Sequence, residues 1–287
     1  MNRLQLAVLG SPIAHSRSPQ LQKVFADSIG LDEFSYERIE TTCDTLTETV
    51  RRLMAEGYDG FNCTMPLKTD MSALADELSE EARILRSVNT VAIRGGRLIC
   101  DTTDGGGILL TIRRGLAPDN ISAASPETFV KGKRVLLLGA GGAARSTALS
   151  MSLAGAELTV LNRTLKSALA LNDMLGGRAV CGELTPERMC EAASEADILV
   201  NCTAAGMTGQ PEFESLDFID ALPESALVID AVYNPLTTTL MKRAEARGLK
   251  VMSGLWMLVY QGALAFEKWS GRLPDEETCA RAFDTIA

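Results

Sequence analysis

A short apolar run, a glycine-rich turn and a helical pattern follow one another directly in the second half of the chain, and this succession restricts the fold most. Residues 135–138 are wholly apolar, as expected for a parallel strand covered on both faces. The turn Gly139-Ala140-Gly141-Gly142-Ala143-Ala144 matches G-x-G-x-x-A. Gly139 permits the tight turn, Gly141 lets the backbone approach a pyrophosphate, and Ala144 allows close helix–strand packing. The N–H groups that open the next helix attract phosphates. The turn therefore predicts a dinucleotide site, with a plain glycine-rich turn as the alternative.

Apolar runs alternate with helical patterns along the rest of the chain, which indicates an α/β fold. In the first half we expect strands and helices, in chain order, at residues 4–9, 21–29, 34–39, 46–55 and 60–63, then a hairpin at 88–93 and 97–100 around Gly95-Gly96. In the second half we expect strands at 135–138, 158–161, 198–200, 227–229 and 250–252, and helices at 143–153, 165–175, 240–246 and 255–266. Residues 117–133 contain turn-forming residues and little periodicity, which predicts an exposed connection.

Composition and charge argue against several classes of function. The 287 residues are long enough for two domains. The net charge of −9, without a basic stripe, argues against a nucleic-acid partner. No stretch approaches the roughly 20 apolar residues of a membrane span, and the N-terminus lacks a signal-peptide pattern. The seven cysteines form no C-x-x-C pair and no metal-site spacing. We expect a cytoplasmic protein without a metal.

The end of the strand at residues 158–161 bears on the choice of nicotinamide cofactor. An NAD site usually carries an acidic residue there, about 20 residues after the glycine turn. This chain has Asn162-Arg163-Thr164 instead. The Arg163 guanidinium suits a 2′-phosphate, and Lys166 adds a second positive charge. The segment favours NADP, and a solvated surface arginine is the alternative.

Three later segments could line the nicotinamide pocket, because ligands bind beyond the carboxyl ends of such strands. They are Asn201-Cys202-Thr203, Gly206-Met207 and residues 230–233. Each segment could equally be a turn whose polar groups satisfy the backbone.

Hydride transfer to a carbonyl needs a proton donor, and the chain offers few candidates. His15 is the only histidine, in a loop rich in hydroxyl groups, but a lone loop histidine is more often structural. Lys68 follows a short strand and is the better candidate, with Asp104 as a possible carboxylate partner. Each of these two could instead be a surface charge. The apolar helix at 255–266 contains Gln261, which needs partners when buried: a substrate's hydroxyls or neighbouring backbone.

A series of motifs along nearly the whole chain resembles the shikimate dehydrogenase family. They are, in order, Gly10-x-Pro12-Ile13-x-His15-Ser16-x-Ser18-Pro19, Asn62-x-Thr64-x-Pro66-x-Lys68, Ser87-Val88-Asn89-Thr90, Thr103-Asp104-Gly105, the glycine turn through Arg145, Asn162-Arg163-Thr164, Asp230-x-Val232-Tyr233-Asn234-Pro235 and Gly254-x-x-Met257-Leu258-x-x-Gln261. Several are long and do not occur in other dinucleotide-binding proteins, so the ordered set is more specific than the glycine turn alone.

The resemblance implies two α/β domains with the active site in the cleft between them. Residues 1–107 would form the substrate domain, completed by 254–287, and residues 108–253 would form the NADP-binding Rossmann domain. The implied reaction is the NADP-dependent, reversible reduction of 3-dehydroshikimate to shikimate, on the chorismate route to aromatic amino acids. The implied partner is this small-molecule substrate alone, with no nucleic acid and no membrane, for a monomer or homodimer.

The resemblance also assigns roles to residues. Lys68 and Asp104 would be the catalytic pair, with Lys68 handling the proton. The substrate's carboxylate, hydroxyls and carbonyl would be held by Ser16, Ser18, Asn62, Thr64, Asn89, Asp104, Tyr233 and Gln261. The cofactor would be held by Gly139, Ala140, Gly141, Gly142, Ala143, Asn162, Arg163, Thr164, Thr203, Met207 and Gly254.

Five positions depart from the family pattern without removing a catalytic residue. Thr102 replaces the usual Asn, Gln22-Lys23 replaces His-Asn, Ser167 stands where a basic residue is common, and Thr238 replaces a proline. They indicate a divergent member. A quinate or dual quinate/shikimate dehydrogenase is therefore an alternative. A ligand sensor that lost turnover, or another NADP oxidoreductase acting for example on a folate, fits the retained motifs less well.

Overall fold

Two six-stranded sheets organise the chain, one in each of two units. The computed structural model describes residues 3–118 and 125–287. Unit 1 comprises Met1–Thr103 with Val259–Ala287, and unit 2 comprises Asp104–Leu258. The expected pair of α/β domains is thereby confirmed. The functional boundaries at 107/108 and 253/254 stay a prediction, and the two units divide within five residues of them.

Unit 1 holds a mixed sheet with the strand order β2-β1-β3-β5-β6-β4. Its elements are β1 (Arg3–Gly10), α1 (Ser18–Ser28), β2 (Glu33–Glu40), α2 (Leu46–Ala55), β3 (Gly60–Cys63), α3 (Lys68–Leu74), β4 (Glu77–Leu78), α4 (Glu80–Leu85), β5 (Thr90–Arg94), β6 (Arg97–Asp101), most of α11 (Gly254–Ser270) and α12 (Glu276–Ile286). β1 pairs in parallel with β2 and β3, whereas β5 runs antiparallel to β3 and β6. The hairpin predicted around Gly95-Gly96 is confirmed, since both glycines adopt the positive φ that its turn requires.

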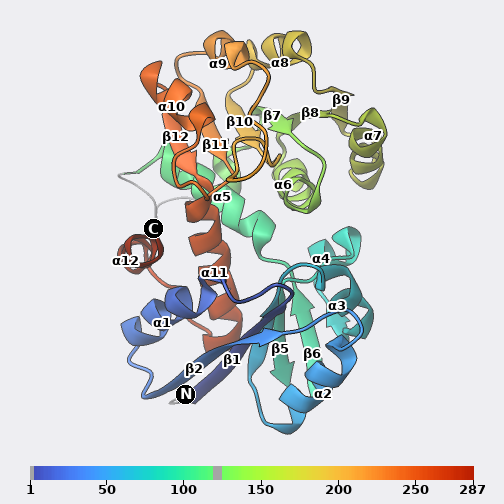
Figure 1. Cartoon of the computed structure of the whole chain (residues 1–287), viewed down its shortest axis with the longest axis vertical. Helices are drawn as coiled ribbons and strands as arrows, with labels where there is room; N and C mark the ends of the chain where they lie inside the picture. Colours follow the sequence, from blue (N-terminus) through green and yellow to red (C-terminus); the bar gives the residue numbers. More distant parts are fainter. Residues whose placement is uncertain (1–2, 119–124) are drawn as a thin grey trace. The chain divides into compact units, whose positions relative to one another are not determined.

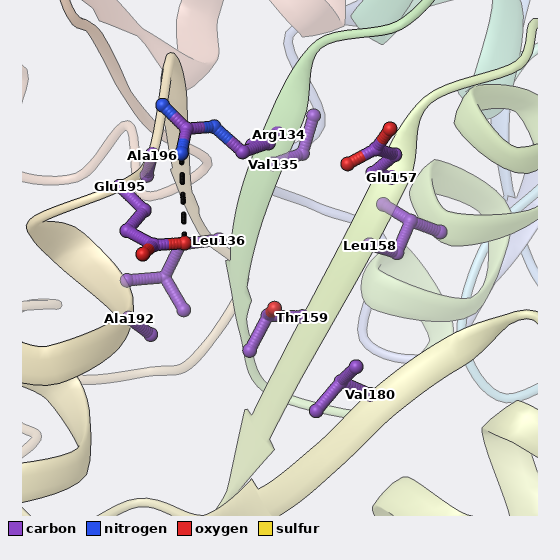
Figure 2. A pocket seen from close by; sticks show the side chains of 10 residues that line it. All are labelled: Arg134, Val135, Leu136, Glu157, Leu158, Thr159, Val180, Ala192, Glu195 and Ala196. Atoms are coloured by element: carbon purple, nitrogen blue, oxygen red, sulfur yellow. Dashed lines mark hydrogen bonds and ion pairs between the residues drawn. The ribbon is translucent and has the colours of Figure 1, made fainter.

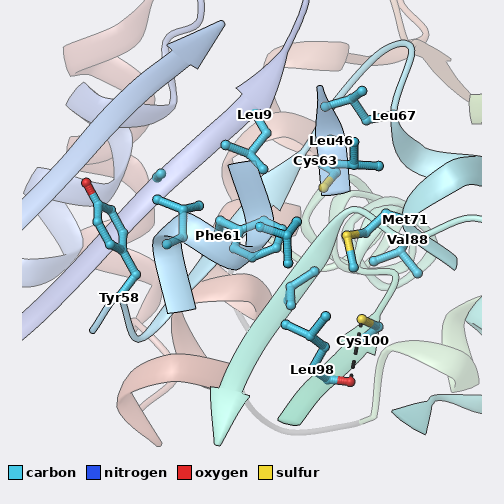
Figure 3. Close-up of a cluster of buried hydrophobic side chains, with 14 of the residues drawn as sticks. Leu9, Leu46, Tyr58, Phe61, Cys63, Leu67, Met71, Val88, Leu98 and Cys100 are labelled. Carbon is cyan, nitrogen blue, oxygen red and sulfur yellow. Dashed lines mark hydrogen bonds between the residues drawn. The ribbon is translucent and has the colours of Figure 1, made fainter. Parts of the chain in front are cut away.

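The period-two pattern of the strands sends apolar side chains to both faces of the unit 1 sheet. Leu9 and Phe61 lie on one face and pack with Leu46 of α2 and Met71 of α3 (Figure 3). On the other face, the ring of Tyr36 packs edge-on against Trp269 of α11, with 6.4 Å between ring centroids. Figure 1 shows α2 and α3 on the side of the sheet opposite α1. The sheet is therefore covered on both faces.

Unit 2 holds a fully parallel sheet with the strand order β12-β11-β10-β7-β8-β9. Its elements are α5 (Asp104–Leu116), the 3-10 helix η1 (Pro126–Phe129), β7 (Arg134–Leu138), α6 (Gly142–Leu153), β8 (Glu157–Asn162), α7 (Leu165–Met174), β9 (Ala179–Glu183), α8 (Pro186–Ala193), β10 (Ile198–Asn201), α9 (Asp217–Ala221), β11 (Leu227–Asp230), α10 (Thr239–Ala246) and β12 (Lys250–Ser253). After β9 the chain returns to the other side of β7, so the strand order reverses between β7 and β10. Dinucleotides bind at this kind of reversal.

The connection predicted at residues 117–133 contains the short helix η1, which the weak periodicity did not reveal. Residues 119–124 of that connection lie outside the described residues. None of the helices within 3–118 and 125–287 has the length and apolar character that a bilayer span requires.

Gly60 of β3 lies against Trp269 of α11, and we expect an added methyl group there to destabilise the fold. A Cβ at this position would lie 2.3 Å from the Trp269 indole nitrogen and 2.3 Å from the Val91 carbonyl oxygen. These two groups are bonded to each other at 2.9 Å and cannot easily separate. Gly60→Ala should lower the free energy of unfolding by about 1–3 kcal/mol, measured by urea denaturation.

The matched control for Gly60→Ala is Gly142→Ala. A Cβ at Gly142 meets no described atom within 4 Å, and the residue begins α6, where alanine is favoured over glycine. This control should keep or slightly raise the stability. Equal stability of Gly60→Ala and the unmodified chain would contradict the steric argument.

Candidate active site

One edge of the unit 1 sheet gathers most of the polar residues selected from the sequence. β1 and β3 are parallel, so their carboxyl ends meet at this edge. β5 runs the opposite way, so its first residue, Thr90, lies at the same edge, paired with Asp101 at the end of β6. The segments that start or end here carry Ser16, Ser18, Thr64, Lys68, Asn89 and, after Asp101, the chain through Thr103 to Asp104.

The serine loop after β1 is packed tightly against the segment after β3. The Ser11 amide donates to the Met65 carbonyl oxygen at 3.0 Å, and the Thr64 amide donates to the Leu9 carbonyl oxygen at 2.9 Å. A Cβ on Gly10 would lie 2.4 Å from the Thr64 methyl carbon, so this approach requires glycine. The loop is also held from β2, because Arg38 donates to the Ser16 carbonyl oxygen from both Nε (2.9 Å) and Nη2 (2.6 Å).

A network of side-chain hydrogen bonds connects the amide residues at this edge. Asn62 donates from Nδ2 to the Asn89 carbonyl oxygen (2.9 Å) and to Thr90 Oγ1 (3.1 Å). Asn89 donates from Nδ2 to Thr103 Oγ1 (3.0 Å) and to Gln261 Oε1 (3.3 Å). The Asn89 Oδ1 atom accepts from the Thr90 hydroxyl (2.8 Å) and the Thr103 amide (2.9 Å). The structure thus brings Asn62, Asn89 and Gln261 together, and their contact with a substrate stays a prediction.

Sequence reasoning missed Tyr36, which extends this network. Its hydroxyl donates to Asn62 Oδ1 at 2.6 Å and also bonds to the Ser18 side chain. Burial raises the pKa of Tyr36 far above its ordinary value, so the hydroxyl keeps its proton. An aromatic residue inside a strand is expected to be core, and no local signal distinguishes this tyrosine from the others.

The candidate catalytic residues each begin a helix. Lys68 is the first residue of α3 and is half-buried. Its backbone oxygen accepts a hydrogen bond from the Val88 amide at 2.9 Å. Asp104 opens α5 and is also half-buried. Lys68 belongs to unit 1 and Asp104 to unit 2, so their pairing stays a prediction. His15 is exposed in the serine loop.

The glycine turn of unit 2 has the geometry that a pyrophosphate needs. Gly139 adopts φ +108°, and a Cβ there would lie 3.0 Å from the Cys202 carbonyl oxygen that follows β10. Gly141 is the N-cap of α6 and has no side chain to cap the helix. No described atom lies within 4 Å of a Cβ built on Gly141 or Gly142. The start of α6 is exposed and has room for a group beside these glycines, which fits a dinucleotide phosphate.

The Asn162-Arg163-Thr164 segment leaves the sheet beside the glycine turn. The Gly139 amide donates to the Leu161 carbonyl oxygen at 2.8 Å, which joins the ends of β7 and β8. Asn162 Nδ2 donates to the Thr164 carbonyl oxygen at 3.0 Å, and this bond closes a turn that contains Arg163. Arg163 is exposed at this same edge, as a contact to a 2′-phosphate requires.

Asp230 is fully buried and orders the ends of β10 and β11. Its Oδ1 atom accepts from Asn201 Nδ2 (2.9 Å) and the Val232 amide (3.1 Å), and its Oδ2 atom accepts from the Thr238 hydroxyl (2.6 Å). Asn201 Oδ1 in turn accepts the Thr203 amide (3.0 Å) and hydroxyl (2.7 Å). This chain of bonds fixes Thr203, a residue predicted to contact the cofactor.

Burial raises the pKa of Asp230, while the three hydrogen bonds that it accepts act in the opposite direction. Thr238, which replaces the family's proline, both donates to this carboxylate and caps α10 by accepting the Met241 amide at 3.3 Å. The departure at Thr238 therefore has a structural reason.

Two loops at this edge of unit 2 support each other. The Thr208 amide donates to the Asn234 carbonyl oxygen at 2.9 Å, which joins the loops that carry Met207 and Tyr233. Both side chains are exposed, at 38% and 41%. Gly254 begins α11, where a Cβ would lie 2.2 Å from the Ala231 carbonyl oxygen, so a close backbone approach explains this glycine.

Thr102 and Gln22, two of the residues that depart from the family pattern, are both buried. Thr102 Oγ1 has no hydrogen-bond partner within the described part of the chain, and its amide donates to Asp101 Oδ1 at 2.8 Å. The Asp101 carboxylate also binds Lys268 Nζ at 2.6 Å, so it supports the turn that leads to Asp104. Gln22 Nε2 donates to the Gly262 carbonyl oxygen at 3.0 Å and ties α1 to α11.

A cavity of about 240 Å³ in unit 2 lies away from these residues. Figure 2 shows it at the start of β7 and β8, where Arg134 reaches Glu195 in a 3.5 Å ion pair. The amino ends of parallel strands lie at the edge opposite the glycine turn, so this cavity is unrelated to the dinucleotide site. Across the described residues, no cluster of three or more His, Cys, Asp or Glu side chains could hold a metal ion.

Comparisons with known proteins agree with this arrangement. Residues 8–91 match the shikimate dehydrogenase substrate binding domain, residues 123–230 match shikimate / quinate 5-dehydrogenase, and residues 254–282 match the shikimate 5'-dehydrogenase C-terminal domain. A shikimate dehydrogenase (NADP(+)) of Thermus thermophilus is 41% identical over 97% of this chain and 98% of its own length.

Two solved structures show the fold over the full length. Shikimate 5-dehydrogenase from Thermus thermophilus, in complex with NADP(H) and shikimate, is 38% identical with a TM-score of 0.82, covering 99% of this chain and 100% of that chain. Ligand-free 5-ketofructose reductase of a Gluconobacter strain is 30% identical with a TM-score of 0.84, covering 99% of both chains.

The buried Asp230 carboxyl should make stability depend on pH. Because its pKa is raised in the folded state, the folded chain binds the proton more tightly than the unfolded chain does. The stabilisation from this group is full below about pH 4 and is lost as pH rises through the raised pKa. Asp230→Asn keeps the shape but cannot ionise. Urea unfolding should therefore show the variant gaining stability relative to the unmodified chain as pH rises. A difference that stays constant with pH would contradict this.

Proposed function

Because this chain belongs to the shikimate dehydrogenase family, we propose that it reduces 3-dehydroshikimate reversibly to shikimate with NADPH. The observation that carries the proposal is the hydrogen-bonded set of Asn62, Asn89 and Gln261 at the sheet edge from which Lys68 departs. Amide groups held in this way suit a small ring that carries several hydroxyls, because a hydroxyl can donate to an amide oxygen or accept from an amide nitrogen.

Lys68 moves the proton in this reaction. In the reductive direction its ammonium group donates a proton to the substrate's carbonyl oxygen, and in the oxidative direction the neutral amine removes the proton from the hydroxyl. NADPH, when bound, supplies the hydride that the carbonyl carbon receives. Asp104 pairs with Lys68 and accepts a hydrogen bond from a substrate hydroxyl, so that the reacting oxygen is held beside the ammonium group.

The remaining proposed contacts divide between substrate and cofactor. Ser16 and Ser18 donate to the substrate's carboxylate, near Tyr233, while Asn62, Thr64, Asn89 and Gln261 bind its hydroxyls and carbonyl. The cofactor's phosphates bind at the turn of Gly139, Ala140, Gly141, Gly142 and Ala143, and its 2′-phosphate binds at Asn162, Arg163 and Thr164. The nicotinamide side is lined by Thr203, Met207 and Gly254.

The proposed enzyme acts in the cytoplasm, as a monomer or homodimer. The seven cysteines support a reducing compartment, because all are free in the described structure and none forms a C-x-x-C pair.

Quinate is the second candidate substrate, because the family model over residues 123–230 describes both shikimate and quinate enzymes. Quinate carries an extra hydroxyl on the carbon that bears the carboxylate, so the residues around the carboxylate decide the preference. The retained Ser16 and Ser18 favour shikimate, and Arg163 argues against a dedicated NAD-dependent quinate enzyme.

Substrate and proton-transfer residue can be tested together. Absorbance of the reduced nicotinamide is followed with shikimate or quinate, each with NADP or NAD. We expect the highest kcat/KM for shikimate with NADP, and Lys68→Ala should lower kcat by at least about 100-fold because the proton carrier is lost.

The matched control is Lys23→Ala, since Lys23 lies on the exposed face of α1 and pairs only locally with Asp27. This variant should retain full activity. A preference for quinate would transfer the function to the second candidate, and an active Lys68→Ala variant would contradict the assigned role of Lys68.

Arg163 is tested through cofactor preference. Loss of a charge-assisted contact to the 2′-phosphate should raise the KM for NADP roughly tenfold to a hundredfold in Arg163→Ala, and should leave the KM for NAD nearly unchanged. Arg178→Ala, another exposed arginine of unit 2, provides the control. An equal effect on both cofactors would show that Arg163 does not recognise the 2′-phosphate.

A further inference from the structure

Tyr36 lies outside the residues that the proposed function uses, yet its hydroxyl bonds to two of them, Asn62 and Ser18. We propose that Tyr36 is a positioning residue that fixes the side-chain amide of Asn62, so that Asn62 presents an oxygen acceptor to one hydroxyl of the substrate. This inference rests on the proposed function, because it takes Asn62 as a substrate contact. It adds the direction of that contact and the residue that enforces it.

The strand order gives Tyr36 its reach. β2 and β3 lie on either side of β1, roughly 9–10 Å apart. Tyr36 stands on β2, paired with Leu6, and Asn62 stands on β3, paired with Val8. Only a long side chain can cross β1 between them. The Tyr36 ring does so on the face covered by α11 and places its hydroxyl 2.6 Å from Asn62 Oδ1.

The partners of Asn62 determine which way its amide points. The backbone oxygen of Asn89 can only accept, so the atom 2.9 Å from it must be the Asn62 nitrogen. The second hydrogen of this nitrogen is used by Thr90 Oγ1 at 3.1 Å. Both donors of Asn62 are thus committed within the protein. Its oxygen accepts from Tyr36 and keeps one lone pair for a ligand. Asn62 therefore recognises a hydroxyl donor, and not a carbonyl or carboxylate oxygen.

Packing holds the Tyr36 hydroxyl in place. The ring is buried and lies edge-on to Trp269, whose indole nitrogen donates to the Val91 carbonyl oxygen at 2.9 Å. The ring therefore cannot swing away from Asn62 without disturbing α11, and the hydroxyl directs the amide through a short, buried bond.

Tyr36→Phe tests the inference, because it removes the hydroxyl and keeps the ring against Trp269. The KM for shikimate should rise roughly threefold to tenfold, which is the effect of losing one neutral hydrogen bond, while the KM for NADP stays unchanged and kcat changes by less than about twofold. Tyr58→Phe is the matched control, since Tyr58 is equally buried but belongs to the core on the other face of the sheet. It should leave the KM for shikimate unchanged.

A double-variant cycle separates positioning through Asn62 from general structural loss. If Tyr36 acts through Asn62, then Tyr36→Phe has no further effect on KM once Asn62→Ala is present. Additive effects in the double variant, or an unchanged KM in Tyr36→Phe alone, would overturn the inference and leave the proposed function intact.

If the unmodified protein acts on neither shikimate nor quinate, the proposed function is refuted. The orientation of Asn62 can still be tested by a measurement that does not depend on turnover. The Asn62 side-chain amide hydrogens, observed by NMR, should exchange with solvent faster in Tyr36→Phe than in the unmodified protein and in Tyr58→Phe. Equal exchange rates in all three proteins would refute the fixed orientation of the Asn62 amide.

Discussion

The side chain of Asn89 joins parts of unit 1 that are far apart in the sequence, and the arrangement of the candidate site depends on it. Its amide bonds to Thr90 on β5, to Thr103 in the turn after β6, and to Gln261 on α11. A buried amide that lost these partners would be costly, so the three segments are held to one geometry. The bond to Gln261 is the one that draws the C-terminal helix into the site, although 172 residues separate the two side chains.

Unit 2 uses the same physical device at its own sheet edge, with a carboxylate in place of an amide. Asp230 receives hydrogen bonds from Asn201, Val232 and Thr238, and Asn201 passes the constraint on to Thr203. In both units, therefore, a buried polar side chain at the end of a strand orders the loops beyond it. These loops carry the residues proposed to contact the ligands, which explains how short, irregular segments keep a defined shape.

Local patterns predicted elements well where a single segment contains its own signal. The strand at 135–138, the glycine turn and the helix after it were all found, because apolar runs and glycine spacing are local properties. The strands β4 and β9 and the helices α3, α4, α8, α9 and α12 were not predicted. β4 has two residues and α3 has seven, too few for a clear period. α12 begins at Glu276, after the N-cap residue Asp275, whose side chain accepts a hydrogen bond from the Thr278 amide.

The sequence by itself determined the α/β class, the dinucleotide turn and most of the candidate residues, because these follow from periodicity, glycine spacing and motif order. Only the tertiary structure decided which side chains contact one another. Asn62 and Tyr36 are 26 residues apart, and their bond exists because β2 and β3 flank β1. Periodicity shows that a strand is present but not its neighbours or its direction, since backbone hydrogen bonds between strands are the same for every sequence. The partner of a buried polar group is therefore fixed by the strand order, which no local pattern contains.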